Sequence, residues 1–122
     1  MFEVCLVKCI WTHPEKIVQE AFGYGGSSNS DGPKVAILKR FISLPFAPFI
    51  GVEVSGDGWN SGPLQRVTWG TTDEQFLCTV ADEYPRTVNG SELTYEFLLE
   101  NNLYEGWLRP DTGGGDAPRL KP

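Results

Sequence analysis

The stretch Leu64–Val80, "LQRVTWGTTDEQFLCTV", contains the pattern that decides the fold. Its polar centre, Thr71–Glu74, separates two runs of β-forming residues and predicts an antiparallel hairpin. A turn between Gly70 and Gln75 would create three cross-strand pairs: Trp69 with Phe76, Val67 with Cys78, and Gln65 with Val80. Two of these pairs are apolar and share one face, as cross-strand packing favours.

Two more strands are predicted to precede this hairpin in a meander. Segment 51–55 would pair with 64–70 around a loop at 56–63, which places Glu53 opposite Arg66. Segment 38–42 would pair with 50–54 and place Lys39 opposite Glu53. The predicted core face consists of Leu38, Ile42, Ile50, Val52, Val54, Val67, Trp69, Phe76, Cys78 and Val80. The predicted outer face carries Lys39, Glu53, Arg66, Thr68 and Thr79, with Phe41 and Leu77 as its apolar members.

The segment "SLPFAPF" at 43–49 connects the first two of these strands. Its PxxP spacing is compatible with a proline-rich ligand, but such ligands extend into solvent and carry a basic residue near one end. Apolar isoleucines flank the segment instead, and the prolines Pro45 and Pro48 withhold two ladder donors. We therefore interpret the segment as a stiff corner between strands.

Helices are predicted on both sides of the meander. Residues 2–11 form a first strand, and Thr12 then caps a short helix that runs to about Phe22. A second helix, capped by Ser91 and ending near Leu103, would cover the apolar sheet face. The fold class is therefore α+β: an antiparallel β-meander sheet of four or five strands, covered on one face by a C-terminal helix, with a short helix after the first strand. Residues 1–108 form one domain, 23–33 a flexible loop and 109–122 a flexible tail.

The charge distribution limits the classes of partner. The chain has a formal net charge of −6, and residues 70–108 alone carry eight acids against one base. Such an excess repels phosphate backbones and disfavours nucleic acid, leaving a solvated face, a basic partner or a divalent cation as interpretations. The sequence lacks an apolar run long enough to span a membrane, so no membrane partner is expected. An odd number of cysteines without an export signal favours the cytoplasm.

A zinc site is the sharpest metal hypothesis in the sequence. Cys5, Cys9 and His13 recur every four residues, and Cys78 is a possible fourth ligand. On a strand, however, positions four apart lie about 13 Å apart, too far to share one ion. The residues around these cysteines favour a strand. We therefore expect no metal and no cofactor.

Polar residues on the predicted core face are the candidate site. Buried polar groups are costly unless they are paired, so these positions mark either a wetted sheet edge or a pocket. In the pocket interpretation, aromatic walls from Trp69, Phe76 and Phe97 would surround polar anchors on the sheet. The predicted ligand-binding residues are Arg40, Gln65, Trp69, Asp82 and Tyr84.

Two functions fit these expectations. The favoured one is a small non-enzymatic binding module, working as a homodimer, that holds a small apolar or acidic molecule or a protein partner. Arg40 would suit a carboxylate ligand. The alternative is a small enzyme in which Arg40, Asp82 and Tyr84 orient a substrate and move protons in the same pocket.

Overall fold

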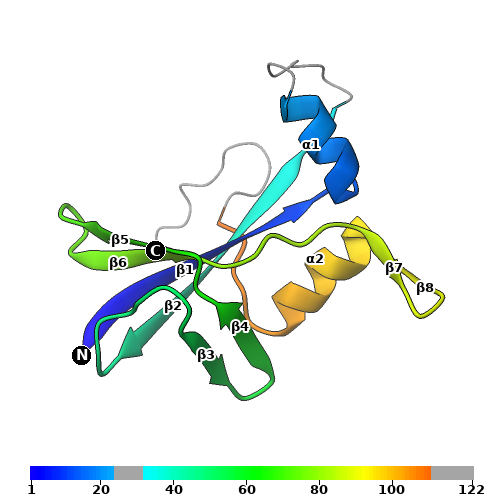
Figure 1. Ribbon diagram of the computed structural model, residues 1–122. Coiled ribbons are helices and arrows are strands. Elements are labelled where there is room, and N and C mark those ends of the chain that lie inside the picture. The colour runs from blue at the N-terminus through cyan, green and yellow to red at the C-terminus, as the bar shows by residue number, and fades with distance from the viewer. Residues whose placement is uncertain (24–31, 111–122) are drawn as a thin grey trace.

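The computed structural model describes residues 1–23 and 32–110 and has an α+β fold (Figure 1). Its elements are, in chain order, β1 (Phe2–Trp11), α1 (Glu15–Gly23), β2 (Val35–Leu44), β3 (Glu53–Gly56), β4 (Trp59–Pro63), β5 (Arg66–Gly70), β6 (Gln75–Thr79), β7 (Arg86–Val88), β8 (Ser91–Leu93) and α2 (Tyr95–Tyr104). Neither helix in this part of the chain is long and apolar enough to cross a membrane. The predicted loop tip at 24–31 and the tail from 111 onward lie outside the described residues.

The main sheet has four strands in the order β2-β1-β6-β5. Strand β1 pairs antiparallel with β2 over ten residues, from Phe2 opposite Leu44 to Trp11 opposite Val35. Its other edge pairs parallel with β6. The sheet is therefore mixed, and its N-terminal strand lies at the centre.

The hairpin of β5 and β6 has the predicted register, with Trp69 opposite Phe76 and Val67 opposite Cys78. The turn between them is closed by a hydrogen bond that the backbone amide of Glu74 donates to the carbonyl of Gly70. The local sequence pattern was sufficient to predict this register, because a short turn leaves few alternative registers.

The predicted pairing of the two preceding strands is wrong. Lys39 lies opposite Val7 on β1, and Glu53 lies opposite Pro63 in a separate hairpin of β3 and β4. The expected loop at 56–63 thus supplies most of that hairpin. The physical reason is length: β1 offers β2 a continuous ten-residue ladder, whereas the segment after "SLPFAPF" could offer only about five pairs. The "SLPFAPF" segment still forms the connection between β2 and β3, with the rings of Phe46 and Phe49 6.2 Å apart.

The C-terminal helix begins later than predicted. Ser91 belongs to the small hairpin of β7 and β8, and Thr94 is the residue that caps α2, its hydroxyl accepting from the amide of Phe97. Gly90, at φ +81°, and Asn89, at φ +50°, form the tight turn that makes this hairpin possible. The predicted end near Leu103 agrees with the structure to within one residue. The short first helix is also present as α1, but Thr12 does not cap it: α1 begins at Glu15, and the Thr12 hydroxyl accepts from the amide of Lys34 instead.

The core lies on one face of the main sheet, under α2 and the β3–β4 hairpin (Figure 1). Every second residue of β1 points into it, because side chains alternate between the two faces of a strand. The fully buried members include Leu6, Ile10, Leu38, Leu64, Cys78 and Trp107. Two residues predicted for this core are exposed: Ile50 lies in the connection before β3, and Trp69 lies at the edge of the sheet.

The corrected sheet order can be tested at two residues, Leu38 and Ile50, because the sequence predicts that both lie in the core. Leu38 is 0% exposed and Ile50 is 68% exposed. We expect Leu38→Ala to lower the free energy of unfolding by about 2–5 kcal/mol, and Ile50→Ala to change it by less than about 0.5 kcal/mol. Urea denaturation measures both values. Equal losses would contradict the described sheet order.

Candidate functional site

The candidate site depends on a shift in register between β1 and the chain that follows β6. Val4 pairs with Phe76, an offset of 72 residues, but Ile10 bridges to Glu83, an offset of 73. One extra residue is therefore inserted between Thr79 and Glu83, as in a β-bulge. An inserted residue exchanges the two faces of the strand beyond it.

This exchange corrects the predicted orientation of the residues after Val80. Regular alternation would direct Asp82 and Tyr84 toward the core and Glu83 away from it. In the structure, Glu83 reaches the core side of the sheet, where its carboxylate accepts from the Lys8 ammonium. Asp82 instead meets Trp11 on the opposite side. The two adjacent carboxylates thus do not converge, as expected for neighbours on an extended chain.

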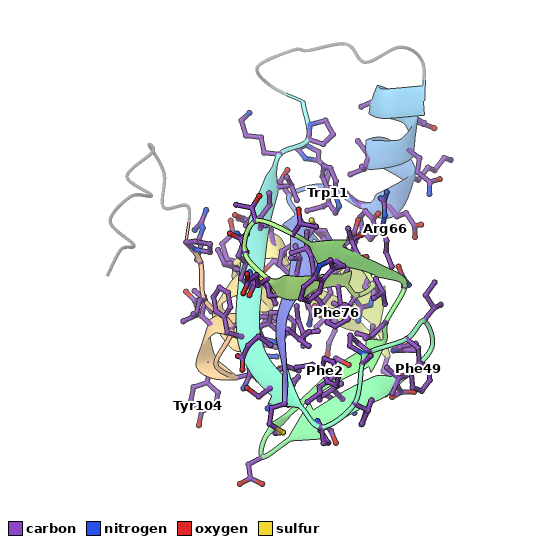
Figure 2. The ribbon with its side chains drawn as sticks, turned by 90° about the vertical axis from the view of Figure 1, so that its left-hand side faces the viewer. Phe2, Trp11, Phe49, Arg66, Phe76 and Tyr104 are labelled. Carbon is purple, nitrogen blue, oxygen red and sulfur yellow. The ribbon has the colours of Figure 1, made fainter. Side chains whose placement is uncertain are left out.

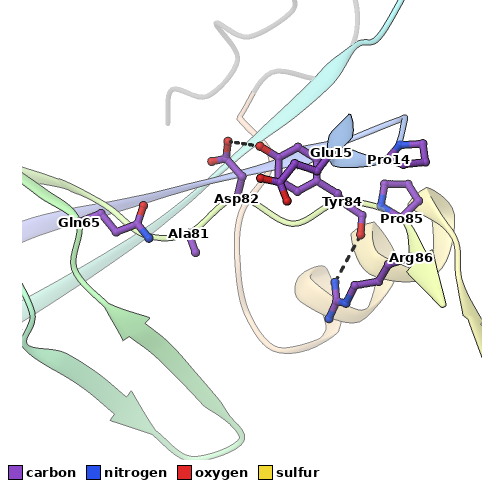
Figure 3. A pocket seen from close by; sticks show the side chains of 8 residues that line it. All are labelled: Pro14, Glu15, Gln65, Ala81, Asp82, Tyr84, Pro85 and Arg86. Atoms are coloured by element: carbon purple, nitrogen blue, oxygen red, sulfur yellow. Dashed lines mark hydrogen bonds between the residues drawn. The ribbon is translucent and has the colours of Figure 1, made fainter. Parts of the chain in front are cut away.

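An open cleft of about 740 Å³ forms where Asp82 and Tyr84 emerge (Figure 3). One side comes from the start of α1, and the other from the connection between β6 and β7. The lining residues are Pro14, Glu15, Gln65, Ala81, Asp82, Tyr84, Pro85 and Arg86. Three of the five predicted site residues, namely Gln65, Asp82 and Tyr84, are among them.

Asp82 is anchored by two aromatic side chains. The Trp11 indole Nε1 donates to Asp82 Oδ2 at 3.0 Å, and the Tyr84 hydroxyl donates to the same oxygen at 3.4 Å. The rings of Trp11 and Tyr84 are stacked, with centroids 6.3 Å apart and planes 5° from parallel. Both contacts end on Oδ2, so they orient the carboxylate while Oδ1 keeps its capacity to accept.

Negative charge dominates this part of the cleft. Burial raises the pKa of the Tyr84 phenol, and the carboxylates of Asp82 and Glu15 raise it further because they oppose a second negative charge. Burial and Asp82 likewise raise the pKa of the Cys9 thiol. Tyr84 therefore keeps its proton at neutral pH and acts as a hydrogen-bond donor. Arg86 is the cation of the cleft, and its guanidinium donates to the Tyr84 carbonyl at 3.4 Å.

Arg40 lies in a different part of the molecule. It pairs with Leu6, five residues along β1 from Trp11, which corresponds to roughly 16 Å. Its guanidinium stacks on Trp59, 3.9 Å from the ring centroid, and donates to the Glu105 carbonyl at 2.9 Å. Burial lowers the pKa of Arg40, and Glu105 opposes this effect. Arg40 thus fastens the β3–β4 hairpin and the end of α2 to the sheet.

Trp69 lies at a third position and is 49% exposed. Its ring packs edge-on against Phe76 at 4.9 Å, toward the end of the sheet that carries Phe2, while Trp11 lies at the opposite end (Figure 2). Phe97, the third predicted wall, is 51% exposed on α2. The single pocket between sheet and helix is therefore not formed by these residues.

Sequence reasoning missed a buried ion pair beneath α2. Lys8 is only 6% exposed, and its ammonium donates to Glu83 at 2.9 Å and to the Asn102 amide oxygen at 2.8 Å. The same ammonium lies 4.7 Å from the ring centroid of Trp107. The sequence does contain a signal for the buried lysine. Lys8 lies on the same strand face as Leu6 and Ile10, so the alternation of side chains alone places it in the core.

The cysteines do not converge on one point. Cys5 and Cys9 lie on one face of β1, whereas Cys78 shares the face of Leu6 on the other side of the sheet. Burial is the largest cause that raises the pKa of all three thiols. His13 faces its neighbour, with Nδ1 2.8 Å from the Thr12 hydroxyl.

Comparison of the chain with protein-family models, with curated proteins and with solved structures finds no match in any of the three.

The raised pKa of Tyr84 predicts a pH dependence of stability. Below the ordinary tyrosine pKa of about 10, the phenol is protonated in both the folded and the unfolded chain. Above it the unfolded chain ionises first, so stability falls as the pH rises through the folded pKa. Between about pH 8 and pH 11, urea denaturation should therefore show a smaller fall for Tyr84→Phe than for the parent. Identical falls would contradict the assignment, because all other titrating groups are shared.

The buried ion pair predicts a non-additive pair of variants. Glu83→Ala leaves the Lys8 ammonium buried without its counter-charge, and we expect a loss of at least about 2 kcal/mol in unfolding free energy. Adding Lys8→Met removes that charge and keeps its methylene stem, so the double variant should be more stable than Glu83→Ala alone. Glu53→Ala, at an exposed acid on β3, is the control and should stay within about 0.5 kcal/mol. Thermal or urea denaturation of these proteins, together with Lys8→Met alone, distinguishes coupling from simple additivity.

Proposed function

We infer that the protein is a small non-enzymatic binding module whose cleft holds a cationic group beside Asp82. The observation that carries this inference is the oriented carboxylate: Trp11 and Tyr84 both hold Oδ2 and stack on each other at the edge of an open cleft. Carboxylates with aromatic faces beside them are a combination that binds ammonium and guanidinium groups. Glu15 adds a second negative charge to the same lining.

The charge of the expected ligand depends on which arginine lines the cleft. An acidic ligand was expected because of Arg40, but that guanidinium is stacked on Trp59 and bonded to Glu105 away from the cleft. Two carboxylates outweigh the single arginine, Arg86, in the cleft lining. A cation is therefore the group that this lining favours electrostatically.

The rest of the lining supports an amphipathic ligand. Pro14, Ala81 and Pro85 provide an apolar surface next to the charged groups. Small-molecule sites combine such surfaces with a few oriented polar groups. Because the cleft is open, a basic side chain of a protein partner is as suitable an occupant as a free amine.

The same geometry favours binding over catalysis. The alternative enzyme requires Arg40, Asp82 and Tyr84 around one substrate, and Arg40 lies roughly 16 Å away along the strand. A general acid or base also works best with a pKa near the operating pH, whereas the pKa of Tyr84 is raised away from it. We propose the cytoplasm as the location, because all three cysteines are free thiols.

A matched pair of probes tests the inference: benzylamine and benzoate share a phenyl ring and differ in charge. We expect benzylamine to shift the NMR signal of the Trp11 indole NH, and benzoate to have a much weaker effect. Asp82→Asn keeps the shape of the side chain and removes its charge. It should weaken benzylamine binding about tenfold, the value of one charge-assisted hydrogen bond.

Two further variants serve as controls. Glu92→Gln removes an exposed acid on β8 and should leave the affinity unchanged. Arg86→Gln removes a repulsive charge from the cleft and should tighten benzylamine binding. Equal binding of the two probes, or an unchanged affinity in Asp82→Asn, would contradict a cation site.

A further inference from the structure

The main sheet has a second face that points away from α2 and from the core. It consists of the alternate residues of all four strands and is called the open face: Glu3, Cys5, Val7 and Cys9 on β1; Val35, Ile37, Lys39, Phe41 and Ser43 on β2; Gln75, Leu77 and Thr79 on β6; and Arg66, Thr68 and Gly70 on β5. Several of its large apolar side chains are exposed, with Phe41 at 57% and Leu77 at 41%. An apolar patch of this kind marks an interaction surface.

The residues of the open face form rows across the strands, as the sheet register shows. An apolar row contains Phe41, Cys5, Leu77 and Thr68. On one side of it lies an acidic row, with Glu3 on β1 and Asp73 in the turn between β5 and β6. On the other side lies a basic row, with Lys39 on β2 and Arg66 on β5.

This order of rows is complementary to itself. Two copies can be placed with their open faces together and a two-fold axis between the sheets, directly above the apolar row and perpendicular to the strands. Rotation about this axis places the apolar row of one copy against the apolar row of the other. The same operation turns the acidic row of each copy over the basic row of the other. Isologous dimers are built in this way, because each subunit contributes the same patch twice. Sheets pack face to face about 10 Å apart, a distance that lysine, arginine and glutamate side chains can span from opposite sides.

The size of the face sets the strength of the contact. Strands β5 and β6 have five residues each, and an axis at Cys5 leaves about three residues of β1 on either side within the overlap. Four strands at about 4.8 Å spacing and about six residues at about 3.3 Å rise then give a contact of roughly 19 by 20 Å. That is on the order of 400 Å² per partner, about half of the roughly 800 Å² of a standard interface. A weak, reversible dimer fits this area.

The chain's own C-terminal segment is a poor alternative cover. Residues 111–122, "DTGGGDAPRLKP", contain one large apolar side chain, Leu120. One leucine cannot replace the contacts that a copy of the apolar row would make with Phe41 and Leu77. The composition of the segment therefore favours a second copy of the chain as the occupant.

We propose that the open face is the interface of a homodimer, in which two sheets pack face to face about a two-fold axis at the apolar row. The interface involves the end of β1 near Glu3, whereas the ligand cleft lies at the end near Trp11. Dimer formation and cation binding are therefore separate properties and can fail independently.

Sedimentation velocity from about 5 to about 500 µM tests the proposal over the range expected for a small interface. The parent should pass from monomer to dimer as the concentration rises. Phe41→Glu and Leu77→Glu each place an unpaired charge in the apolar row and should raise the dimer dissociation constant at least about tenfold. Phe97→Glu, at a phenylalanine on α2 that is 51% exposed, should leave the dimer dissociation constant unchanged. Far-UV circular dichroism of each variant verifies folding.

Charge reversal tests the two-fold arrangement itself. Lys39→Glu places like charges opposite Glu3 of the other copy and should weaken the dimer. Adding Glu3→Lys restores opposite charges and should recover most of the affinity. Reversing the charge of Arg66, and then that of Asp73 as well, provides the same test on the β5 side of the sheet.

Three results would overturn the proposal. The first is a parent that stays monomeric over the whole range. The second is a dimer that survives both Phe41→Glu and Leu77→Glu, since another surface would then be the interface. The third is a monomeric parent that dimerises only after residues 111–122 are removed, because the tail would then be the occupant of the face.

Discussion

Strand β1 is paired along both of its edges, and the rest of the structure is arranged around this strand. One edge carries the ten-residue antiparallel ladder to β2, and the other carries the parallel ladder to β6 and the bridge to Glu83. The backbone donors and acceptors of a central strand are thereby satisfied without water. Its alternate side chains, with Leu6 and Ile10 on one face and Cys5 and Cys9 on the other, then define the core and the open face.

The inserted residue between Thr79 and Glu83 links the core to the candidate site. It turns Glu83 inward, where the carboxylate compensates the buried charge of Lys8. The same turn brings Asp82 and Tyr84 outward to Trp11 at the mouth of the cleft. Residues that follow one another in sequence thus point alternately into the core and toward the candidate cleft. The buried ion pair holds in place the segment from which the cleft is built.

Local patterns predicted part of this arrangement correctly. The hairpin of β5 and β6 was predictable because a turn of four polar residues leaves one register that pairs Trp69 with Phe76. The partition of Phe41, Leu77, Lys39, Arg66, Thr68 and Thr79 to one face also agrees with the structure, although their strands are paired differently. It agrees because alternation assigns residues to a face without specifying which strand lies next to it.

The candidate site was less accessible to such reasoning. Gln65, Asp82 and Tyr84 do lie together, but Asp82 and Tyr84 were assigned to the opposite face, because regular alternation was extended past Val80. Arg40 and Trp69 were grouped with them on the assumption of a meander. A register shift leaves no mark in the local pattern of side chains, and neither does the choice of partner strand. Both depend on backbone hydrogen bonds between segments far apart in the sequence, 24 to 42 residues for β1 with β2 and 72 residues for β1 with β6.

The sequence by itself determined the α+β class, the β5–β6 hairpin, the α1 helix and the acidic character of the second half, because each depends on neighbouring residues or on composition. Only the tertiary structure decided that β1 is the central strand, that Lys8 is buried against Glu83, and that Asp82, which lines the cleft, accepts a hydrogen bond from Trp11. The physical reason is that these features arise when distant strands compete for the same backbone edges. The longest continuous ladder prevails in that competition, and side chains follow the faces that it assigns.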